Sequence, residues 1–243
     1  MARPTGCCAV TGGGGFIGRH IVEACLSEFD AVRSVDLVAS TQSAAELHIA
    51  DINEPDQLSA ALRGCTAVIH CAGIVDTRSG RLHEQRIHRG NVAGTAAVIE
   101  ACRREAVEVL VFVSSHSAVS DGVWGDDGGA LRGEGNASAY GRSKLAAERA
   151  VVAAHQAAGG LSTVCVRPQI VFGPGDPLFT NELLLGAAPP PLLGDGRTMH
   201  TPIYVKNLAG QQVKRAAMTR HGSQGLARHG RAQPAPRASI CPV

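Results

Sequence analysis

The stretch Val10-Thr-Gly-Gly-Gly-Gly-Phe-Ile-Gly18 ends an apolar run, Cys7–Thr11, and begins a segment with helical spacing, 16–28. Glycines at such a junction let the chain turn sharply and leave the first N–H groups of the helix open to an anion. Further apolar, β-branched runs occur at 31–38, 46–50, 66–70, 109–113 and 162–166, and helical patterns separate them at 55–63, 82–104 and 138–158. Six strands that alternate with helices predict an α/β fold, a doubly wound parallel sheet covered on both faces.

The spaced glycines and a later aspartate together predict a Rossmann-type dinucleotide site. Gly12 permits the tight turn, Gly15 lets the backbone approach a pyrophosphate, and Gly18 allows close helix packing. Asp36 ends the second predicted strand, where its carboxylate would accept hydrogen bonds from ribose hydroxyls and repel a 2′-phosphate. Because Arg33 lies too early on that strand to bind such a phosphate, the site favours NAD over NADP. The alternative is a glycine turn followed by an incidental aspartate.

Tyr140 and Lys144 stand four residues apart in a predicted helix, so their side chains share one face. An ammonium beside a phenol stabilises the phenolate, which would lower the tyrosine pKa from about 10 toward the working pH. Such a tyrosine can exchange a proton with a substrate oxygen. Most pairs with this spacing are solvated helix faces, but the glycine turn upstream favours a nicotinamide-dependent oxidoreductase.

Composition narrows the class of protein. The chain has 243 residues, 44% hydrophobic and 18% charged, as expected for one large globular core. Its eight cysteines include no Cys-x-x-Cys, so we interpret them as reduced, buried thiols of an intracellular protein. No apolar run of about 18 residues occurs, so we expect no membrane span and a location in the cytoplasm or at the surface of intracellular membranes. His70, His116 and His200 are isolated, which indicates packing or surface histidines and no metal site.

Two segments depart from the strand–helix alternation. Residues 120–135 are rich in glycine and acid, and we expect a flexible loop over the ligand crevice, in which Trp124 either pins the loop or contacts substrate. Residues 210–243 hold six basic residues and no acidic one. Because this segment lacks aromatic residues and helical periodicity, we expect a disordered basic tail that binds no nucleic acid.

At these motifs the sequence resembles the extended short-chain dehydrogenase/reductase superfamily, and within it the 3β-hydroxysteroid dehydrogenase branch. The resemblance covers about residues 5 to 209. It rests on an ordered set of motifs: Thr11–Gly18, Asp51-Ile52, His70-Cys-Ala-Gly73, Asn91-Val-Ala-Gly-Thr95, Phe112-Val-Ser-Ser115, Tyr140-Gly-Arg-Ser-Lys144 and Arg167–Asp176.

The resemblance implies a role for each catalytic position. Tyr140 is the general acid/base, and Lys144 lowers its pKa and holds the nicotinamide ribose. Ser115 would hydrogen-bond the substrate oxygen, and it is chosen over Ser114 and Ser117 because it closes the fifth predicted strand.

The same resemblance implies the cofactor contacts. Asp51 and Ile52 would contact the adenine, although Asp51 is also placed to cap a turn before the next helix. Ala72 and Gly73 would line the cofactor groove, and Arg167 and Pro168 would lie beside the nicotinamide. The other implied cofactor-binding residues are Gly12, Gly15, Phe16, Ile17, Gly18, Asp36, Asn91, Tyr140 and Lys144.

The chain departs from the family pattern after residue 209, where relatives continue into a further strand and a substrate lobe. We therefore expect an NAD-binding domain over 1–178, a partial substrate-binding segment over 179–209 and the tail over 210–243. An end at this point would leave the sixth strand as an exposed edge of the sheet.

The predicted function is NAD-dependent oxidation of a secondary alcohol, with a steroid-like alcohol or ketone as the small-molecule partner. Two alternatives stay open: a nucleotide-sugar epimerase or reductase with the same catalytic residues, and a non-catalytic NAD-binding protein. A homodimer is a further expectation drawn from the resemblance.

Overall fold

The computed structural model describes residues 6–39, 44–76, 78, 80–119, 138–155, 160–177, 201–228 and 239–242. The glycine-rich loop at 120–135 with Trp124, most of the segment 179–209, and His200 therefore lie outside the described residues. The domain boundaries at 178 and 209 stay predictions.

A seven-stranded parallel sheet forms the centre of the fold, with the strand order β3-β2-β1-β4-β5-β6-β9. Its strands are β1 Cys7–Thr11, β2 Ala31–Asp36, β3 Glu46–Ile49, β4 Cys65–His70, β5 Val109–Val113, β6 Ser162–Arg167 and β9 Ser239–Pro242. The first six match the predicted strands, so the doubly wound parallel fold is confirmed. The strand order reverses direction between β1 and β4, which is where ligands of such sheets bind.

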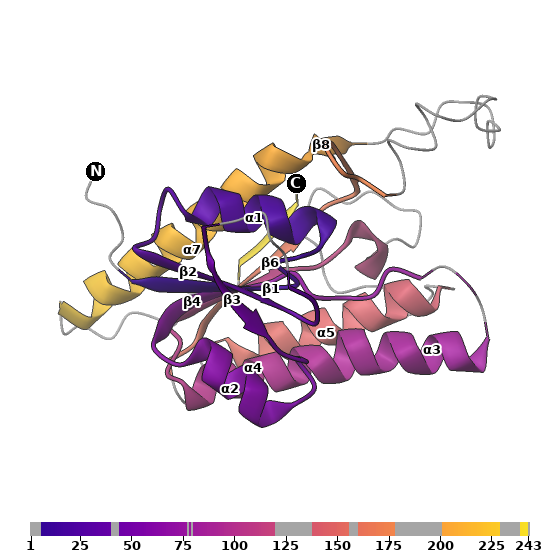
Figure 1. Ribbon diagram of the computed structural model, residues 1–243, viewed down its shortest axis with the longest axis horizontal. Helices are drawn as coiled ribbons and strands as arrows, with labels where there is room; N and C mark the ends of the chain where they lie inside the picture. The colour runs from indigo at the N-terminus through magenta and orange to yellow at the C-terminus, as the bar shows by residue number, and fades with distance from the viewer. Residues whose placement is uncertain are drawn as a thin grey trace.

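Helices cover both faces of the sheet (Figure 1). On one face lie α1 Phe16–Cys25 and α7 Val205–Arg228, and on the other lie α2 Pro55–Leu62, α4 Gly94–Arg104 and α5 Ala139–Ala154. The helix predicted over 82–104 comprises α3 Arg81–Ile87, a π-helical turn His88–Ala93 and α4. A short 3₁₀ turn, His116–Ala118, follows β5, and β7 Ile170–Phe172 pairs with β8 Pro202–Tyr204 in a second small sheet.

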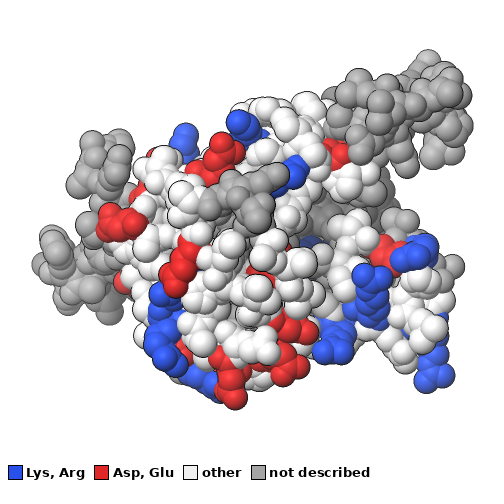
Figure 2. Space-filling view, in the orientation of Figure 1, with Lys and Arg blue, Asp and Glu red and all other residues white. Residues whose placement is uncertain are grey.

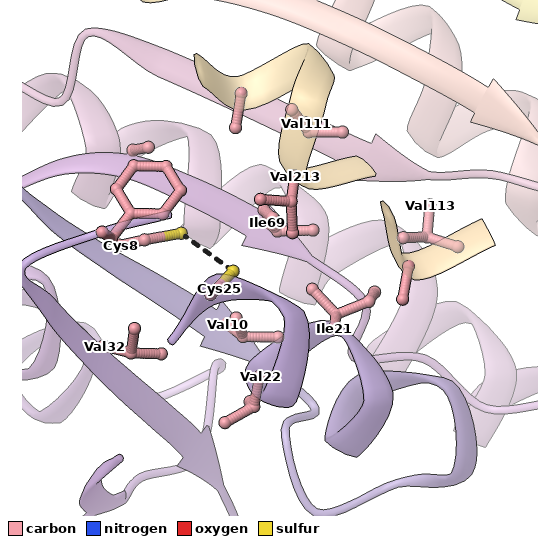
Figure 3. Packing of buried hydrophobic residues seen from close by; sticks show 14 of the residues in the cluster. Cys8, Val10, Ile21, Val22, Cys25, Val32, Ile69, Val111, Val113 and Val213 are labelled. Carbon is pink, nitrogen blue, oxygen red and sulfur yellow. Dashed lines mark hydrogen bonds between the residues drawn. The ribbon is translucent and has the colours of Figure 1, made fainter. Parts of the chain in front are cut away.

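Two apolar clusters fill the spaces between the sheet and its helices. Because side chains alternate along a strand, Cys8 and Val10 of β1 face α1 and α7, whereas Ala9 faces α2 and α4. Figure 3 shows the first cluster, in which Val213 of α7 points toward Ile69 and Val111 of the sheet. The central strands β1, β4, β5 and β6 are thus buried on both sides, which explains their largely apolar sequences, whereas the edge strand β3 is mostly exposed.

The predicted disorder of residues 210–243 is wrong for 210–228 and for 239–242. Residues 210–228 continue the helix α7, and β9 pairs in parallel register with β6, so β6 is not an edge of the sheet. The helical spacing was present in the sequence at its buried positions, Val205, Leu208, Ala209, Gln212, Val213 and Ala216. It was missed because half of those positions hold alanine or glutamine, which carry little hydrophobic signal.

Surface charge and cysteine state complete the description. Figure 2 shows acidic and basic side chains interspersed over one face, with several basic ones near α3. All seven cysteines whose side chains are described are free thiols, and five of them are buried. In the part of the chain that the structure describes, no helix is both long enough and apolar enough to cross a bilayer.

Removing the α7 anchor should destabilise the fold. Leu208 is fully buried in the first cluster, so we expect Leu208→Ala to reduce the free energy of unfolding by about 2–5 kcal/mol, measured by urea denaturation. Met218, on the same helix but exposed, serves as the control, and Met218→Ala should change stability by less than about 0.5 kcal/mol. Equal effects of the two substitutions would show that α7 does not pack as described.

Candidate active site

A cleft of about 1040 Å³ lies beyond the carboxyl ends of β1, β2, β4, β5 and β6. It brings together nearly all of the predicted site residues. Those that line it are Gly12, Gly15, Phe16, Ile17, Gly18, Asp36, Asp51, Ile52, Ala72, Gly73, Ser115, Tyr140, Lys144 and Pro168. The cleft walls do not include Asn91 or Arg167.

The glycine turn has little room for side chains. Gly12 adopts a φ of +72°, and a Cβ there would lie 2.6 Å from the backbone nitrogen of Ala72. A Cβ on Gly18 would overlap the carbonyl oxygen of Gly12. These contacts agree with the predicted roles of Gly12 in the turn and of Gly18 in helix packing. Gly15 caps α1 without a side-chain hydrogen bond, so the amino end of the helix meets the cleft as bare backbone.

Asp36 stands at the rim of the cleft at the end of β2. Its carboxylate accepts hydrogen bonds from the N–H of Gly14 at 2.9 Å and of Leu37 at 2.7 Å. Each oxygen keeps acceptor capacity for a diol at the cleft. Arg33 is held elsewhere, with its Nε donating to Glu46 at 3.0 Å, and does not line the cleft.

Asp51 and Ile52 form the neighbouring wall. The Asp51 carboxylate accepts from the backbone N–H and the side-chain amide of Asn53, both at 2.9 Å, and these bonds lower the pKa of Asp51. Asp51 therefore caps the turn and also lines the cleft, and its contact with the adenine stays a prediction. Ile52 packs against α4 at Gly94. A Cβ on Gly94 would lie 2.5 Å from the Cδ1 atom of Ile52.

Asn91 acts from behind the cleft wall. From the π-helical turn, its side chain accepts from the N–H of Ile74 at 2.7 Å and donates to the carbonyl of Ile74 at 3.0 Å. It also donates to Ser143 on α5 at 2.9 Å. Asn91 thus fixes the segment that follows β4, including Gly73, and is placed to support a cofactor site without forming its surface.

Tyr140 and Ser115 meet at the cleft. Ser115 is the second residue after β5, and its side chain hydrogen-bonds that of Tyr140. The Ser115 hydroxyl also accepts from the N–H of Ser117 at 3.1 Å. Burial raises the pKa of Tyr140, and the Ser115 bond opposes that effect only in part. The phenol is therefore protonated at neutral pH.

Lys144 is buried rather than solvated. Its Nζ donates to the carbonyl oxygen of Val113 at 2.7 Å and lies 4.2 Å from the centre of the Phe112 ring. Burial lowers the pKa of Lys144 to about 8. The expectation that Lys144 lowers the Tyr140 pKa is not met in this structure, because burial of the phenol dominates. The spacing argument considered charge alone and could not include desolvation.

A buried ion pair lies next to Ser114, the neighbour of Ser115. Arg167 is paired with Glu148 of α5 through Nε at 3.0 Å and through its terminal nitrogen, and Ser114 donates to Glu148 at 2.6 Å. Glu148 has no solvent exposure, so its charge and that of Arg167 are compensated by each other and not by water. Arg167 itself does not line the cleft, and its predicted position beside the cofactor stays a prediction. Its side chain ties β6 and β5 to α5, while Pro168 lines the cleft.

His70 is a packing histidine, as predicted. It is fully buried, bonded to Thr11 at 2.7 Å and to Thr95 at 3.0 Å, and stacked on Phe112. Burial lowers its pKa to about 3, so it stays neutral. Within the described ranges, no group of three or more histidine, cysteine, aspartate or glutamate side chains is arranged to hold a metal ion.

Several cleft residues were missed by the sequence analysis. Arg86 and Arg89 reach the cleft from the helix before Asn91, and the Arg89 guanidinium lies 3.8 Å from Asp51. The sequence offered one signal for these two arginines: they precede Asn91 in the same predicted helix, 82–104. Gln169, Ile170, Val171 and Asp176 come from the segment after β6, which has no periodic pattern.

Comparison with known proteins gives consistent results. A model of the 3-beta hydroxysteroid dehydrogenase/isomerase family matches residues 9–224. Among curated proteins, the chain is 29% identical over 93% of its length to a bovine (Bos taurus) "sterol-4-alpha-carboxylate 3-dehydrogenase, decarboxylating", covering 63% of that protein. It is 33% identical over 85% of its length to "3beta-hydroxysteroid-dehydrogenase/decarboxylase isoform 2" of Arabidopsis thaliana, covering 40% of it. The chain thus spans about 40–63% of the length of these two relatives.

A solved structure shares the fold over most of the chain. "MoeE5 in complex with UDP-glucose and NAD" superposes with a TM-score of 0.74 at 28% identity, covering 98% of this chain and 76% of that one. The likeness covers nearly the whole of this chain, the parallel sheet included.

The buried ion pair provides a direct test of the site. Glu148→Gln keeps the side-chain shape but leaves the Arg167 guanidinium buried without its counter-charge, so we expect a loss of about 3–5 kcal/mol in the free energy of unfolding. Glu100→Gln on the exposed surface of α4 is the matched control and should cost less than about 0.5 kcal/mol. Thermal and urea unfolding of both variants measure the difference, and a Glu148→Gln protein as stable as the parent would contradict this role.

Proposed function

Because the chain belongs to the 3-beta hydroxysteroid dehydrogenase/isomerase family, we propose that it transfers hydride between NAD and a secondary alcohol or the matching ketone. One observation carries the proposal: Tyr140 and Ser115 are hydrogen-bonded at the wall of the same cleft that contains the glycine turn and Asp36. A proton-transfer group and a dinucleotide site thus share one cleft, as hydride transfer requires.

The residues of the cleft fit NAD. The bare amino end of α1 and the space above Gly15 suit a pyrophosphate, and the Asp36 carboxylate suits the two ribose hydroxyls. Asp51 and Ile52 would flank the adenine, and Pro168 would lie near the nicotinamide. A 2′-phosphate would face the Asp36 carboxylate, which disfavours NADP.

The chemistry divides between the cofactor and the protein. Bound NAD supplies a hydride acceptor. The Tyr140 oxygen takes the hydroxyl proton during oxidation and returns it to the carbonyl oxygen during reduction, while Ser115 orients the substrate oxygen. Because the pKa of Tyr140 is raised, the protonated phenol suits the reduction direction at neutral pH, and oxidation should accelerate as the pH rises.

A steroid-like alcohol or ketone is the proposed substrate. Besides Ser115 and Tyr140, the cleft is lined by four apolar residues, Ile74, Val75, Ile170 and Val171. Such a lining suits an apolar ring system. The names of the bovine and Arabidopsis relatives include sterol or hydroxysteroid dehydrogenation, which supports the same class. The assembly state stays a prediction, and sedimentation velocity would test the expected homodimer.

A nucleotide-sugar substrate is the second candidate. The likeness to MoeE5, whose structure holds UDP-glucose and NAD, favours it, as do the cationic side chains Arg86 and Arg89 in the cleft. Incubation with NAD and either a 3β-hydroxysteroid or UDP-glucose distinguishes the candidates. Under the first proposal, NADH should form with NAD and the steroid but not with NAD and UDP-glucose.

Replacing the proton-transfer group should stop turnover. Tyr140→Phe removes the hydroxyl with little change in volume, so we expect kcat to fall by about 10²-fold or more while NAD affinity stays within about twofold. Tyr204 lies on β8, outside the cleft, and Tyr204→Phe is the matched control. A Tyr140→Phe enzyme with parental kcat would refute the assignment, whereas NAD binding without turnover in the parent would favour a non-catalytic binding protein.

Cofactor preference should depend on Asp36. Asp36→Ala removes the acceptor for the ribose hydroxyls, so we expect NAD affinity to fall by about tenfold and the preference over NADP to shrink. Asp56→Ala on the exposed first turn of α2 is the control. Isothermal titration with NAD and NADP measures both affinities, and equal affinities in the parent chain would rule out this role for Asp36.

A further inference from the structure

We propose that Cys7 and Cys65 form a reactive dithiol that small disulfides oxidise to an intramolecular disulfide. The pair lies at the amino ends of β1 and β4, at the opposite edge of the sheet from the cleft. This modification site is independent of the proposed hydride transfer, which uses none of these residues.

The backbone places the two thiols for bond formation. Cys7 and Cys65 are register partners on adjacent parallel strands, and their Sγ atoms are 3.2 Å apart. Neighbouring strands lie about 4.8 Å apart, within the range of about 4.4–6.8 Å that disulfides span between Cα atoms. A disulfide therefore requires side-chain rotation rather than movement of the sheet.

A fixed cation accompanies the pair. The Arg33 guanidinium lies 3.6 Å from the Cys65 sulfur, and the same nitrogen donates to the carbonyls of Ala61 at 3.0 Å and Arg63 at 2.7 Å. Its Nε donates to Glu46 at 3.0 Å. Because these bonds hold the guanidinium beside the sulfurs, its charge stabilises a thiolate there.

The two thiols have different roles. Cys7 is partly exposed at the start of β1, whereas Cys65 is 2% exposed. The hydrogen bond from Cys65 and the nearby charge of Arg33 lower the pKa of Cys7 to about 7, against the opposing effects of burial and Glu46. Cys7 is therefore the attacking thiolate and Cys65 the resolving thiol.

The reaction balances as a thiol–disulfide exchange. The Cys7 thiolate attacks one sulfur of a small disulfide, forms a mixed disulfide and releases one thiolate, which takes a proton from solvent. Cys65 then loses its proton to solvent, attacks the Cys7 sulfur and expels the second thiolate, which is protonated in turn. Counted from the two protonated thiols, the protein loses two electrons and two protons, and the small disulfide becomes two thiols.

A second cysteine pair in the same chain provides an internal comparison. Cys8 and Cys25 lie 3.8 Å apart in the first apolar cluster, where both side chains are fully buried (Figure 3). The hydrogen bond with the Cys25 thiol, together with burial, raises the pKa of Cys8. This pair should stay reduced under conditions that oxidise Cys7 and Cys65.

The experiment treats the full chain with oxidised glutathione at pH 7.5, traps remaining thiols with iodoacetamide and maps the peptides by mass spectrometry. We expect a peptide pair that links Cys7 to Cys65 and has lost two hydrogen atoms, with Cys8 and Cys25 unlinked. A linkage between other cysteines would overturn the proposal. The proposal would also fail if no linkage formed and iodoacetamide alkylated Cys7 in the native protein no faster than the buried Cys102 of α4.

Three variants separate reactivity from folding. Cys65→Ser should trap a stable mixed disulfide on Cys7, because no resolving thiol remains. Arg33→Gln should slow alkylation of Cys7 at pH 7.5 by several-fold, whereas Arg33→Lys, which retains the charge, should restore part of the rate. Circular dichroism confirms folding of each variant. A folded Cys65→Ser protein that gains no glutathione would also contradict the proposed dithiol. So would a folded Arg33→Gln protein whose Cys7 is alkylated at the parental rate.

Discussion

The close approach of Gly12 to the segment after β4 is the constraint on which the cofactor half of the molecule depends. The backbone nitrogen of Ala72 lies only 2.6 Å from where a Cβ on Gly12 would be, so β1 and β4 can turn outward together only with glycine there. The helix α1 then begins directly above the turn, because Gly18 also lacks a side chain. Asn91 fixes the other wall by bonding both backbone groups of Ile74. These contacts leave a cleft at the switch point of the sheet.

The catalytic half depends on a different kind of contact, a charge network removed from water. Glu148 joins Arg167 at the end of β6 to Ser114 at the end of β5, and it does so from the helix that carries Tyr140 and Lys144. Each strand end is thereby fixed relative to that helix. Because an unpaired charge in this place would cost several kcal/mol, the network favours one arrangement of Ser115 and Tyr140.

The sequence predicted the parts of the fold that carry a strong local signal. β1, β4, β5 and β6 are largely apolar runs, and the glycine turn marks where the first of them ends. The same approach failed for α7, whose buried face includes Ala209, Gln212 and Ala216. It also failed for β9, a four-residue strand that follows a region without periodicity and pairs with β6.

By itself, the sequence determined which residues can turn, bind a dinucleotide and exchange a proton, because glycine, aspartate and tyrosine have those properties wherever they stand. Only the tertiary structure decided where each side chain points and how it is solvated. It paired Arg167 with Glu148, placed Asn91 behind the cleft and raised the Tyr140 pKa. It also brought Cys7 beside Cys65, 58 positions away. Burial and contacts between distant segments set these outcomes, and neither is encoded in local spacing.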